Sequence, residues 1–462
     1  MEQKACPPKF LNKSSETMKN QEKYQKLGRA WIISVNMGYG HQRTAFPLKN
    51  LAFQEEIINA NNYQGIPKRD RNIWEGIRKF YELISNFYRT PLIGKMVFGV
   101  FDKFQRIFSF YPKIELSKPN FQLKQIISMI KAGWGKDLIL RLRAEKIGKT
   151  LPLITTFFTP AFMAEFFNYP GEIFCIICDA DISRTWVSIS PRQSRIKYFA
   201  PTERAVERLK LYGVKPENII FSGYPLPLEN IGSPKMEILK EDLKYRILNL
   251  DPQKKYFLKY ETLIKNNLGE LPKNSDHPLT IMFSVGGAGA QKEIGIRIIK
   301  SLSKEIKEGK VKVILSAGIR KSVKEYFEKE ICRGRTSAKL DYGAGVEILY
   351  QEKIEDYFKI FNQKLRKTDI LWTKPSEISF YTALGIPIII TPAIGSQEEF
   401  NKRWLLKSGF GLLQEDPIHA NQWLFDWLDK GYLAESAMEG FIEGEKLGTF
   451  KISRTIHEFG HE

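Results

Sequence analysis

Residues 369–404 constrain the fold of this chain most, because apolar strands alternate there with polar turns and helices. Two short apolar runs, 370–373 and 386–391, each lead through a polar segment into a helix. Strand, helix, strand, helix is the pattern of an α/β domain with a parallel sheet. Ligands of such sheets bind beyond the carboxyl ends of the strands. The polar segments 374–377 and 395–401 should therefore lie beside one crevice.

A glycine-rich loop occurs upstream of this stretch. The strand 280–284 runs into a loop, 285–291, that holds three glycines before a helix. Free backbone N–H groups at such a helix start suit a phosphate, and a nearby carboxylate suits ribose hydroxyls. Further strands at 312–316 and 346–350 complete the unit. The sequence therefore predicts a nucleotide-binding domain in this half of the chain.

The N-terminal half opens in the same way. A strand at 30–36 leads into Gly38, Gly40 and His41, and a helix is expected over 42–60. The glycines allow a backbone to approach a ligand closely. His41 stands at the mouth of the sheet, where it could act as general base for a hydroxyl group. The alternative is a histidine that only caps the helix, and the local pattern favours the two interpretations about equally.

A second set of polar residues follows the predicted strand 173–178, which ends in Asp179 and Asp181. Their D-x-D spacing is typical of a metal site in another class of glycosyltransferase. There it holds the donor, whereas here the donor site is expected in the other half, so we expect no metal. Cys175 and Cys178 face opposite sides of one strand and have no second ligand pair, which argues against zinc or redox work.

Charge limits the choice of partners. The chain of 462 residues has 71 Lys and Arg against 52 Asp and Glu, a formal net charge of +19, which indicates an anionic partner. Within 68–149 there are 18 Lys and Arg against 7 Asp and Glu, interleaved with aromatic residues such as Trp74, Phe110 and Tyr111. This composition favours contact with an anionic membrane surface. A helical subdomain with the aromatics in its core is the other interpretation, and no recognised nucleic-acid-binding module is visible.

The location of the protein is predicted from what the chain contains. The four scattered cysteines indicate a reducing compartment. The first residues are polar, and no run of 18 apolar residues occurs. We therefore expect a cytoplasmic protein that associates peripherally with a membrane.

Several motifs, in order along the chain, are similar to those of one enzyme superfamily: GYGH at 38–41, ICDADIS at 177–183, the stretch 198–227, GGAGAQ at 286–291, and TKPSE followed by SQEEFN. The chain resembles the GT-B glycosyltransferases. It is most similar to the monogalactosyldiacylglycerol synthase family and more distantly to the N-acetylglucosaminyltransferase that forms lipid II. The resemblance covers most of residues 30–411.

One segment departs from the family pattern. The family has a glycine-rich TKxGG loop and then a glutamate about five residues before the glycine that corresponds to Gly385. Here that place holds Phe380, the loop is two residues shorter, and Glu377 is the nearest carboxylate. Either Glu377 takes over the ribose contact from a shifted position, or the contact is lost.

The expected architecture is α/β: a GT-B fold of two Rossmann-like domains that face each other across a cleft. The N-terminal acceptor domain spans 1–228 and includes the basic helical insertion 68–149. A charged helical linker spans 229–278, the nucleotide-sugar domain spans 279–425, and helices at 426–462 return toward the N-terminal domain.

The resemblance implies a metal-independent, inverting enzyme that transfers a sugar from a UDP-sugar to a lipid hydroxyl, with no cofactor besides the donor substrate. A non-catalytic nucleotide- or lipid-binding protein and a nucleotide-sugar epimerase are the alternatives. His41 and Asp181 are the expected catalytic residues, with Asp181 orienting His41 or positioning the acceptor. Gly38, Gly40 and Asp179 are expected to bind the acceptor. The expected donor-binding residues are Gly286, Gly287, Gly289, Gln291, Lys374, Ser376, Glu377, Ser396, Gln397 and Asn401.

Overall fold

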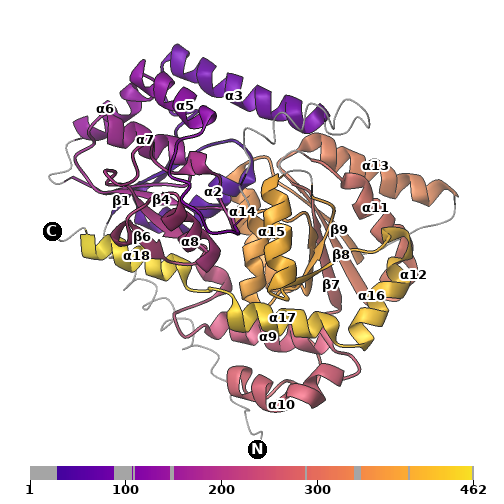
Figure 1. The fold of residues 1–462 in the computed structure, drawn as a ribbon. Helices are drawn as coiled ribbons and strands as arrows, with labels where there is room; N and C mark the ends of the chain where they lie inside the picture. Colours follow the sequence, from indigo (N-terminus) through magenta and orange to yellow (C-terminus); the bar gives the residue numbers. More distant parts are fainter. Residues whose placement is uncertain are drawn as a thin grey trace, which may run out of the picture.

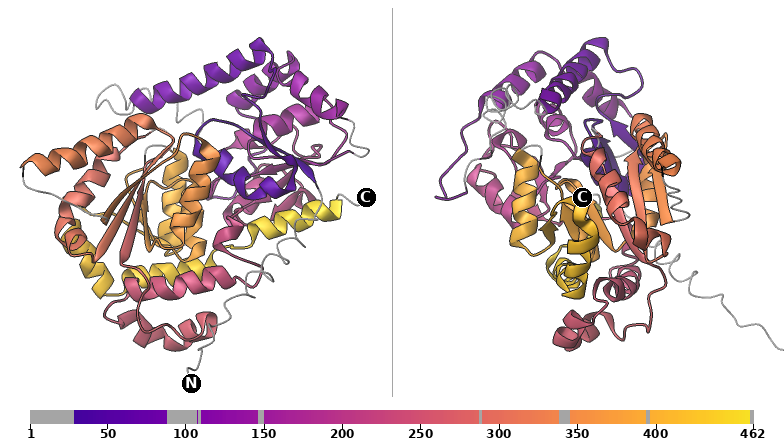
Figure 2. Two further views of the ribbon diagram at one scale, coloured as in Figure 1. Left: turned by 180° about the vertical axis from the view of Figure 1, so that it is seen from behind. Right: turned by 90° about the vertical axis from the view of Figure 1, so that its right-hand side faces the viewer.

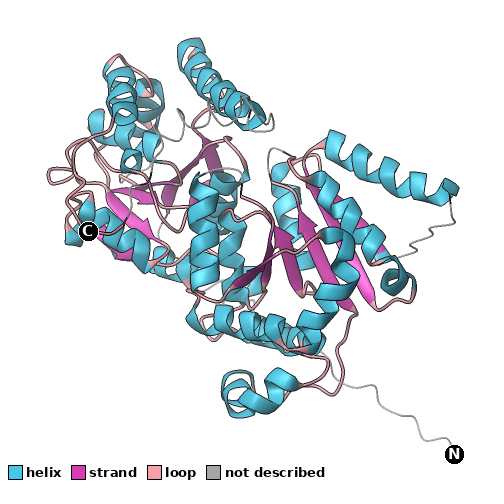
Figure 3. Cartoon of the chain, turned by 45° about the vertical axis from the view of Figure 1, so that its right-hand side comes forward, coloured by secondary structure: helices cyan, strands magenta, loops and turns pink. Residues whose placement is uncertain are grey.

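The chain folds around two six-stranded sheets whose paired strands are all parallel. The structure is a computed structural model, and it describes residues 29–87, 107, 110–145, 150–286, 289–337, 345–393 and 396–459. The first sheet has the order β2-β1-β3-β4-β5-β6 and the second β12-β11-β10-β7-β8-β9. Helices flank both sheets (Figures 1 and 3). The predicted GT-B architecture of two Rossmann-like domains is confirmed. The strands are β1 (Ala30–Ser34), β2 (Ala52–Asn59), β3 (Leu153–Thr155), β4 (Ile173–Ile176), β5 (Lys197–Ala200), β6 (Ile219–Phe221), β7 (Leu279–Ser284), β8 (Val311–Gly318), β9 (Val346–Tyr350), β10 (Ile370–Thr373), β11 (Ile388–Ile390) and β12 (Gly411–Leu413).

The described helices divide by chain order into an N-terminal group and those that follow it. The N-terminal group comprises α2 (Tyr39–Ala45), α3 (Lys68–Phe87), α5 (Phe121–Lys131), α6 (Lys136–Ala144), α7 (Phe158–Phe166) and α8 (Glu203–Leu211). The others are α9 (Glu237–Leu250), α10 (Lys255–Leu268), α11 (Lys292–Ser301), α12 (Ser303–Lys307), α13 (Lys321–Ser337), α14 (Ile354–Leu365), α15 (Ser396–Lys407), α16 (Ala420–Asp429), α17 (Tyr432–Glu443) and α18 (Gly448–Phe459). Short 3-10 helices lie at η1 (Phe46–Leu51), η2 (Arg184–Trp186), η3 (Pro216–Asn218), η4 (Leu228–Asn230), η6 (Glu377–Leu384) and η7 (Pro417–His419).

The strand order determines where each domain can bind a ligand. In the first sheet the chain moves outward from β1 to β2 and then returns to the other side of β1 with β3. In the second sheet the same reversal separates β7 from β10. Ligands of open parallel sheets bind at these reversals, beyond the carboxyl ends of the strands. The loop with His41 lies at the first reversal, and the loops with Gly286 and Lys374 lie at the second.

The prediction of a single helix over 42–60 is wrong. The α-helix ends at Ala45, a 3-10 helix carries Pro47 near its start, and residues 52–59 form β2. Proline inside the expected helix would remove one backbone hydrogen bond and clash with the preceding turn. The segment therefore changes direction there and pairs in parallel with β1.

One further helix is of a different type from the one expected, whereas the charged segment 229–278 is helical as expected. The helix expected between Lys374 and Gly385 is the 3-10 helix η6, which is buried from Ile378 to Leu384. The charged segment 229–278 holds α9 and α10, and α9 inserts Leu243 into the core of the second domain. Arg246 on α9 is buried and donates to the carbonyl oxygens of Thr368 and Leu384. These bonds attach α9 to the second sheet.

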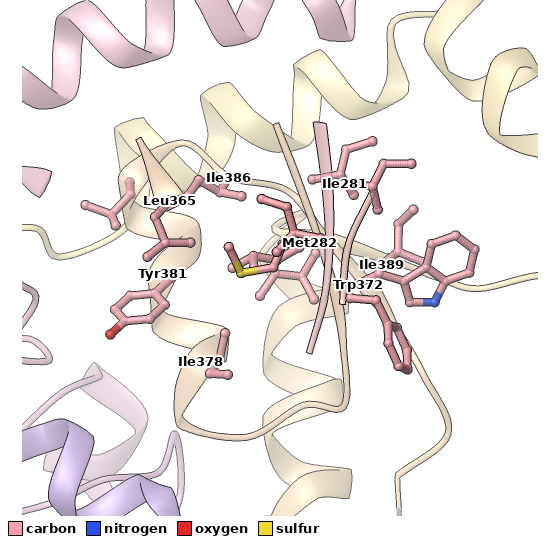
Figure 4. Close-up of a cluster of buried hydrophobic side chains, with 14 of the residues drawn as sticks. Ile281, Met282, Leu365, Trp372, Ile378, Tyr381, Ile386 and Ile389 are labelled. Atoms are coloured by element: carbon pink, nitrogen blue, oxygen red, sulfur yellow. The ribbon is translucent and has the colours of Figure 1, made fainter. Parts of the chain in front are cut away.

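The main core lies around the second sheet, where strands that are buried on both faces carry almost only apolar side chains. Figure 4 shows part of it, with Trp372 and Ile281 from neighbouring strands and Tyr381 from η6. The C-terminal helix α18 belongs to the other domain. Its Ile452 and Ile456 pack with the first sheet in a separate cluster, and α18 runs beside that sheet (Figures 1 and 2).

Candidate functional site

His41 is placed by the turn that joins β1 to α2. Gly38 has φ of 110°, a value that L side chains rarely adopt, and it precedes the first turn of α2. His41 Nδ1 lies 2.8 Å from the carbonyl oxygen of Thr156, at the end of the neighbouring strand β3. Because a carbonyl oxygen only accepts, Nδ1 carries the proton and donates it. The lone pair of His41 is therefore on Nε2.

The surroundings of His41 keep it neutral. Its ring lies against Phe157 and Trp186, with ring centroids 4.8 and 6.1 Å away. Burial lowers the pKa of His41 to about 4, although the bond to Thr156 and the negative charge of Glu377 act in the opposite direction. A neutral imidazole with a bare Nε2 can accept a proton from a hydroxyl group at neutral pH.

The expectation that Asp181 orients His41 is corrected by the structure. Asp181 is buried, and its two carboxylate oxygens accept from Arg208 Nε at 2.8 Å and Nη2 at 2.9 Å. Oδ1 also accepts from the backbone N–H of Ile182. Since His41 Nδ1 already donates to Thr156, both groups have other partners. Asp181 ties the end of β4 to Arg208 on α8.

Of the two aspartates that follow β4, Asp179 and Asp181, Asp179 is the one that contacts the other domain. It accepts a 3.1 Å hydrogen bond from Asn401 Nδ2, and Asn401 Oδ1 accepts from the backbone N–H of Ala180 at 2.9 Å. Asn401, predicted to bind the donor, therefore contacts the predicted acceptor side from the second domain. Burial, followed by the charges of Glu377 and Glu398, raises the pKa of Asp179 to about 6, while Asn401 and Lys374 act against the rise.

Lys374 lies over the glycine-rich loop. A Cβ built on Gly286 would meet the Lys374 Cε atom at 2.1 Å, so only glycine allows this approach. Lys374 forms an ion pair with Glu398 in the first turn of α15. Burial disfavours its charged form, but the carboxylates of Glu398, Glu377 and Asp179 outweigh burial and raise the pKa of Lys374. The ammonium group is thus held charged beside the loop.

The other predicted donor-binding residues differ in how they are placed around the glycine-rich loop and Lys374. Gly289 continues the loop with φ of 68°, and Gly287 lies outside the described residues. Gln291 is engaged locally, since its amide donates to Pro392 O at 2.9 Å and accepts from Thr391 Oγ1 at 2.8 Å. Three more lie on the same edge: Ser376 just before η6, and Ser396 and Gln397 in the first turn of α15. The side chain of Ser396 is outside the described part of the chain.

Glu377 faces the opposite domain. Its Oε1 atom lies 3.3 Å from Arg43 Nε, and its side chain is 12% exposed. Its Oε2 atom would lie 3.4 Å from a Cβ built on Gly40. The structure therefore brings Glu377 together with the predicted acceptor loop.

Two site residues were missed from the sequence, Tyr39 and Arg43, which occupy one face of α2 at i and i+4 spacing. Tyr39 Oη accepts from the backbone N–H of Ile319 at 2.9 Å. The Arg43 guanidinium lies over the rings of Phe358 and Phe361, 4.7 and 4.4 Å from their centroids. This helical spacing was the available signal, because it places two large side chains on one face of the helix that carries His41. They join α2 to the second domain.

The next feature is whether the described residues include a cluster that could bind a metal ion. Within them, no group of three or more His, Cys, Asp or Glu side chains is arranged to hold a metal ion. Cys175 and Cys178 are both buried as free thiols. Burial raises the pKa of both thiols, and Cys178 Sγ lies 3.2 Å from Thr156 O, where its S–H can donate.

Comparison with known proteins finds similar structures, but at low sequence identity and low TM-score. Residues 271–403 match the model of a domain of unknown function (DUF6938), and no curated protein matches. The UDP-GlcNAc 2-epimerase of Neisseria meningitidis, solved bound to UDP-GlcNAc, is 15% identical, with 74% of this chain and 84% of that chain covered and a TM-score of 0.44. MurG of Acinetobacter baumannii is 13% identical, with 93% and 99% covered and a TM-score of 0.44. A Rickettsia africae glycosyltransferase is 13% identical, with 74% and 83% covered and a TM-score of 0.37. The GT-B fold of this chain rests on its two sheets, and these values add no argument about its activity.

Proposed function

We propose that this protein is a glycosyltransferase that moves a sugar from a UDP-sugar to a hydroxyl group of a membrane lipid. The observation that carries the proposal is the placement of His41. A neutral histidine with a bare Nε2 lies at the sheet reversal of one domain, and Asp179 of that domain accepts a hydrogen bond from Asn401 of the other. A base and a diphosphate cradle on facing domains are what sugar transfer to a hydroxyl requires.

The chemistry follows from these groups. His41 Nε2 accepts the proton of the acceptor hydroxyl while its oxygen attacks the anomeric carbon of the donor. The bond from that carbon to the diphosphate oxygen breaks, and negative charge develops on the diphosphate. The backbone N–H group of Gly286, with the Lys374 ammonium, would stabilise that charge, whereas the Gly289 N–H already donates to the carbonyl oxygen of Gly286. We propose that no metal takes part and that the anomeric configuration inverts.

The lipid acceptor is proposed from the surface of the N-terminal domain. Helix α3 carries the exposed basic residues Arg69, Arg71, Arg78 and Lys79. On the same domain, large apolar side chains are exposed at Tyr111, Ile114, Phe121 and Leu140. Basic and apolar groups on one domain suit the interface of an anionic membrane. No described helix is long and apolar enough to cross a bilayer.

The aromatic residues of the insertion divide between two roles. Trp74 is buried against Trp134, with ring centroids 4.7 Å apart, and Phe110 lies under Arg204. These two support the domain. Tyr111 is 68% exposed and is available to a membrane surface. Residues 88–106, 108–109 and 146–149 of the insertion lie outside the described part of the chain.

A turnover screen tests the proposal. Purified protein is incubated with each of several UDP-sugars and a total lipid extract, and both the lipids and the nucleotide sugars are analysed. A glycolipid and free UDP in equal amounts are the expected products. An epimerised nucleotide sugar without glycolipid would identify an epimerase, and no turnover together with UDP binding would identify a nucleotide-binding scaffold.

A further inference from the structure

Glu377 lies against the helix that carries His41, although it belongs to the other domain. It is the first residue of η6, directly after the turn that follows β10. One carboxylate oxygen is paired with Arg43 in α2, and the other would contact any side-chain carbon placed at Gly40. Gly40 precedes His41, and Arg43 follows it by two residues. The Glu377 carboxylate therefore lies beside the first turns of α2.

The phosphate loop has a different set of charged partners. Lys374 is the side chain in contact with Gly286, and it pairs with Glu398 from α15. A ribose bound next to a diphosphate would need a carboxylate whose oxygens are free to accept from two hydroxyls. Glu377 is turned toward the acceptor loop and is held by Arg43, so it is poorly placed for that contact.

Arg43 fixes the position and the charge of Glu377. The guanidinium is buried between α2 and the rings of Phe358 and Phe361. Removing a paired cation from such a place would leave the carboxylate uncompensated. The ion pair therefore holds the Glu377 carboxylate against α2.

We propose that Glu377 is the positioning residue of His41, supplied by the opposite domain, and is not a ribose ligand. When His41 takes the proton of the acceptor it becomes positively charged, and the negative charge of Glu377 stabilises that imidazolium. The base is then complete only while the two domains are in contact. This inference rests on the proposed function for its catalytic meaning, whereas the electrostatic coupling between Glu377 and His41 can be tested without an activity assay.

The electrostatics of the site agree with this placement. The charge of Glu377 raises the pKa of His41 against the larger effect of burial, and it also raises the pKa of Asp179 and of the Cys178 thiol. The other charged groups around the site are Arg43 on α2 itself, Asp179 after β4, and Lys374 with Glu398 from the second domain. Glu377 is the carboxylate among them that touches α2.

The test compares Glu377→Gln with Glu398→Gln, a matched change of another largely buried carboxylate in the same domain. Histidines are labelled with ¹⁵N, and the His41 signal is identified by its loss in His41→Gln. The Nε2 chemical shift is followed from about pH 7.5 down to about pH 4.5, and UDP affinity is measured by calorimetry on the same samples.

The wild-type shift should begin to move toward the imidazolium value at the acidic end, since the pKa of His41 is about 4. In Glu377→Gln the Nε2 chemical shift of His41 should change little over this pH range, because loss of the anion moves protonation of His41 to lower pH. In Glu398→Gln the chemical shift should follow that of the wild type. UDP affinity should be unchanged in Glu377→Gln. In the transfer assay kcat should fall about 10- to 1,000-fold with KM for the donor unchanged.

An unchanged His41 titration in Glu377→Gln overturns the inference, and so does a loss of UDP affinity of the size a ribose ligand would cause. A wild-type protein that binds no UDP and transfers no sugar contradicts the proposed function instead. In that case the titration of His41 still decides whether Glu377 is its anionic partner.

Discussion

His41 donates its Nδ1 proton to the carbonyl oxygen of Thr156 over 2.8 Å, and this bond determines which nitrogen can act as a base. The two residues end up adjacent because β1 and β3 pair in parallel and their carboxyl ends meet at one edge of the sheet. A backbone carbonyl cannot be removed by a side-chain change, so the tautomer of His41 is built into the fold.

Breaking the buried ion pair between the domains should be strongly destabilising. Arg43→Met leaves the Glu377 carboxylate without its cation, and we expect the free energy of unfolding to fall by about 3 to 5 kcal/mol. Urea unfolding followed by circular dichroism measures the change. Arg43→Met combined with Glu377→Gln should recover a large part of the loss, because no charge is then left unpaired.

The control for this prediction is Lys49→Met. Lys49 pairs with Glu355 across the same pair of domains, but both side chains are partly exposed. We expect a change within about 1 kcal/mol, as for other exposed ion pairs. If Arg43→Met were as mild as Lys49→Met, the α2 contact would not hold the domains together.

A second histidine should make stability depend on pH. His277 Nε2 lies 3.1 Å from Asp369 Oδ1 before β10, and its Nδ1 faces Asp276; Asn249 on α9 and Lys367 also contact these carboxylates. Burial acts to lower the pKa of His277, but the two carboxylates outweigh it and raise that pKa above 6.5. The imidazolium is therefore favoured in the folded state.

The direction of the pH effect follows from the raised value. The stabilisation is complete below the unfolded pKa of about 6.5 and is lost as pH rises through the higher folded pKa. We expect the free energy of unfolding to decrease from about pH 6.5 upward. His277→Gln should remove that slope, whereas the same change at the exposed His419 should leave it. A slope that survives in His277→Gln would assign it to other groups.

Membrane association should depend on the charge of α3. Wild-type protein should sediment with vesicles of phosphatidylglycerol more than with phosphatidylcholine, and salt should weaken the binding. Reversing Arg71, Arg78 and Lys79 to Glu should weaken it by about 1 kcal/mol for each positive charge that is removed near the surface. The same reversal at Lys321 and Lys324, on α13 of the other domain, is the control. Equal sedimentation with both lipids would contradict the electrostatic part of the proposal.

The sequence predicted those parts of the fold that depend on local pattern. Apolar runs such as 173–176 and 370–373 were recognisable as strands because parallel strands are buried on both faces. The strand β2 was not, because its polar residues Gln54 and Glu55, both with positive φ, break the alternation and resemble a helical face.

The partners of the site residues could not be predicted, since they come from distant parts of the chain. Asp181 is held by Arg208, and Glu377 is held by Arg43, 334 positions away. Nothing in the local sequence distinguishes a carboxylate that binds a ligand from one that pairs with a buried arginine. Only the packing of α8 and α2 decides between these roles.

The most direct test of the central claim is the transfer rate of His41→Ala, measured beside its UDP affinity. If His41 is the base, this variant should fold and bind UDP like the wild type, while kcat falls by roughly 10² to 10⁴. Full activity in His41→Ala would contradict the account and would make Asp179, with its pKa of about 6, the next candidate for the base.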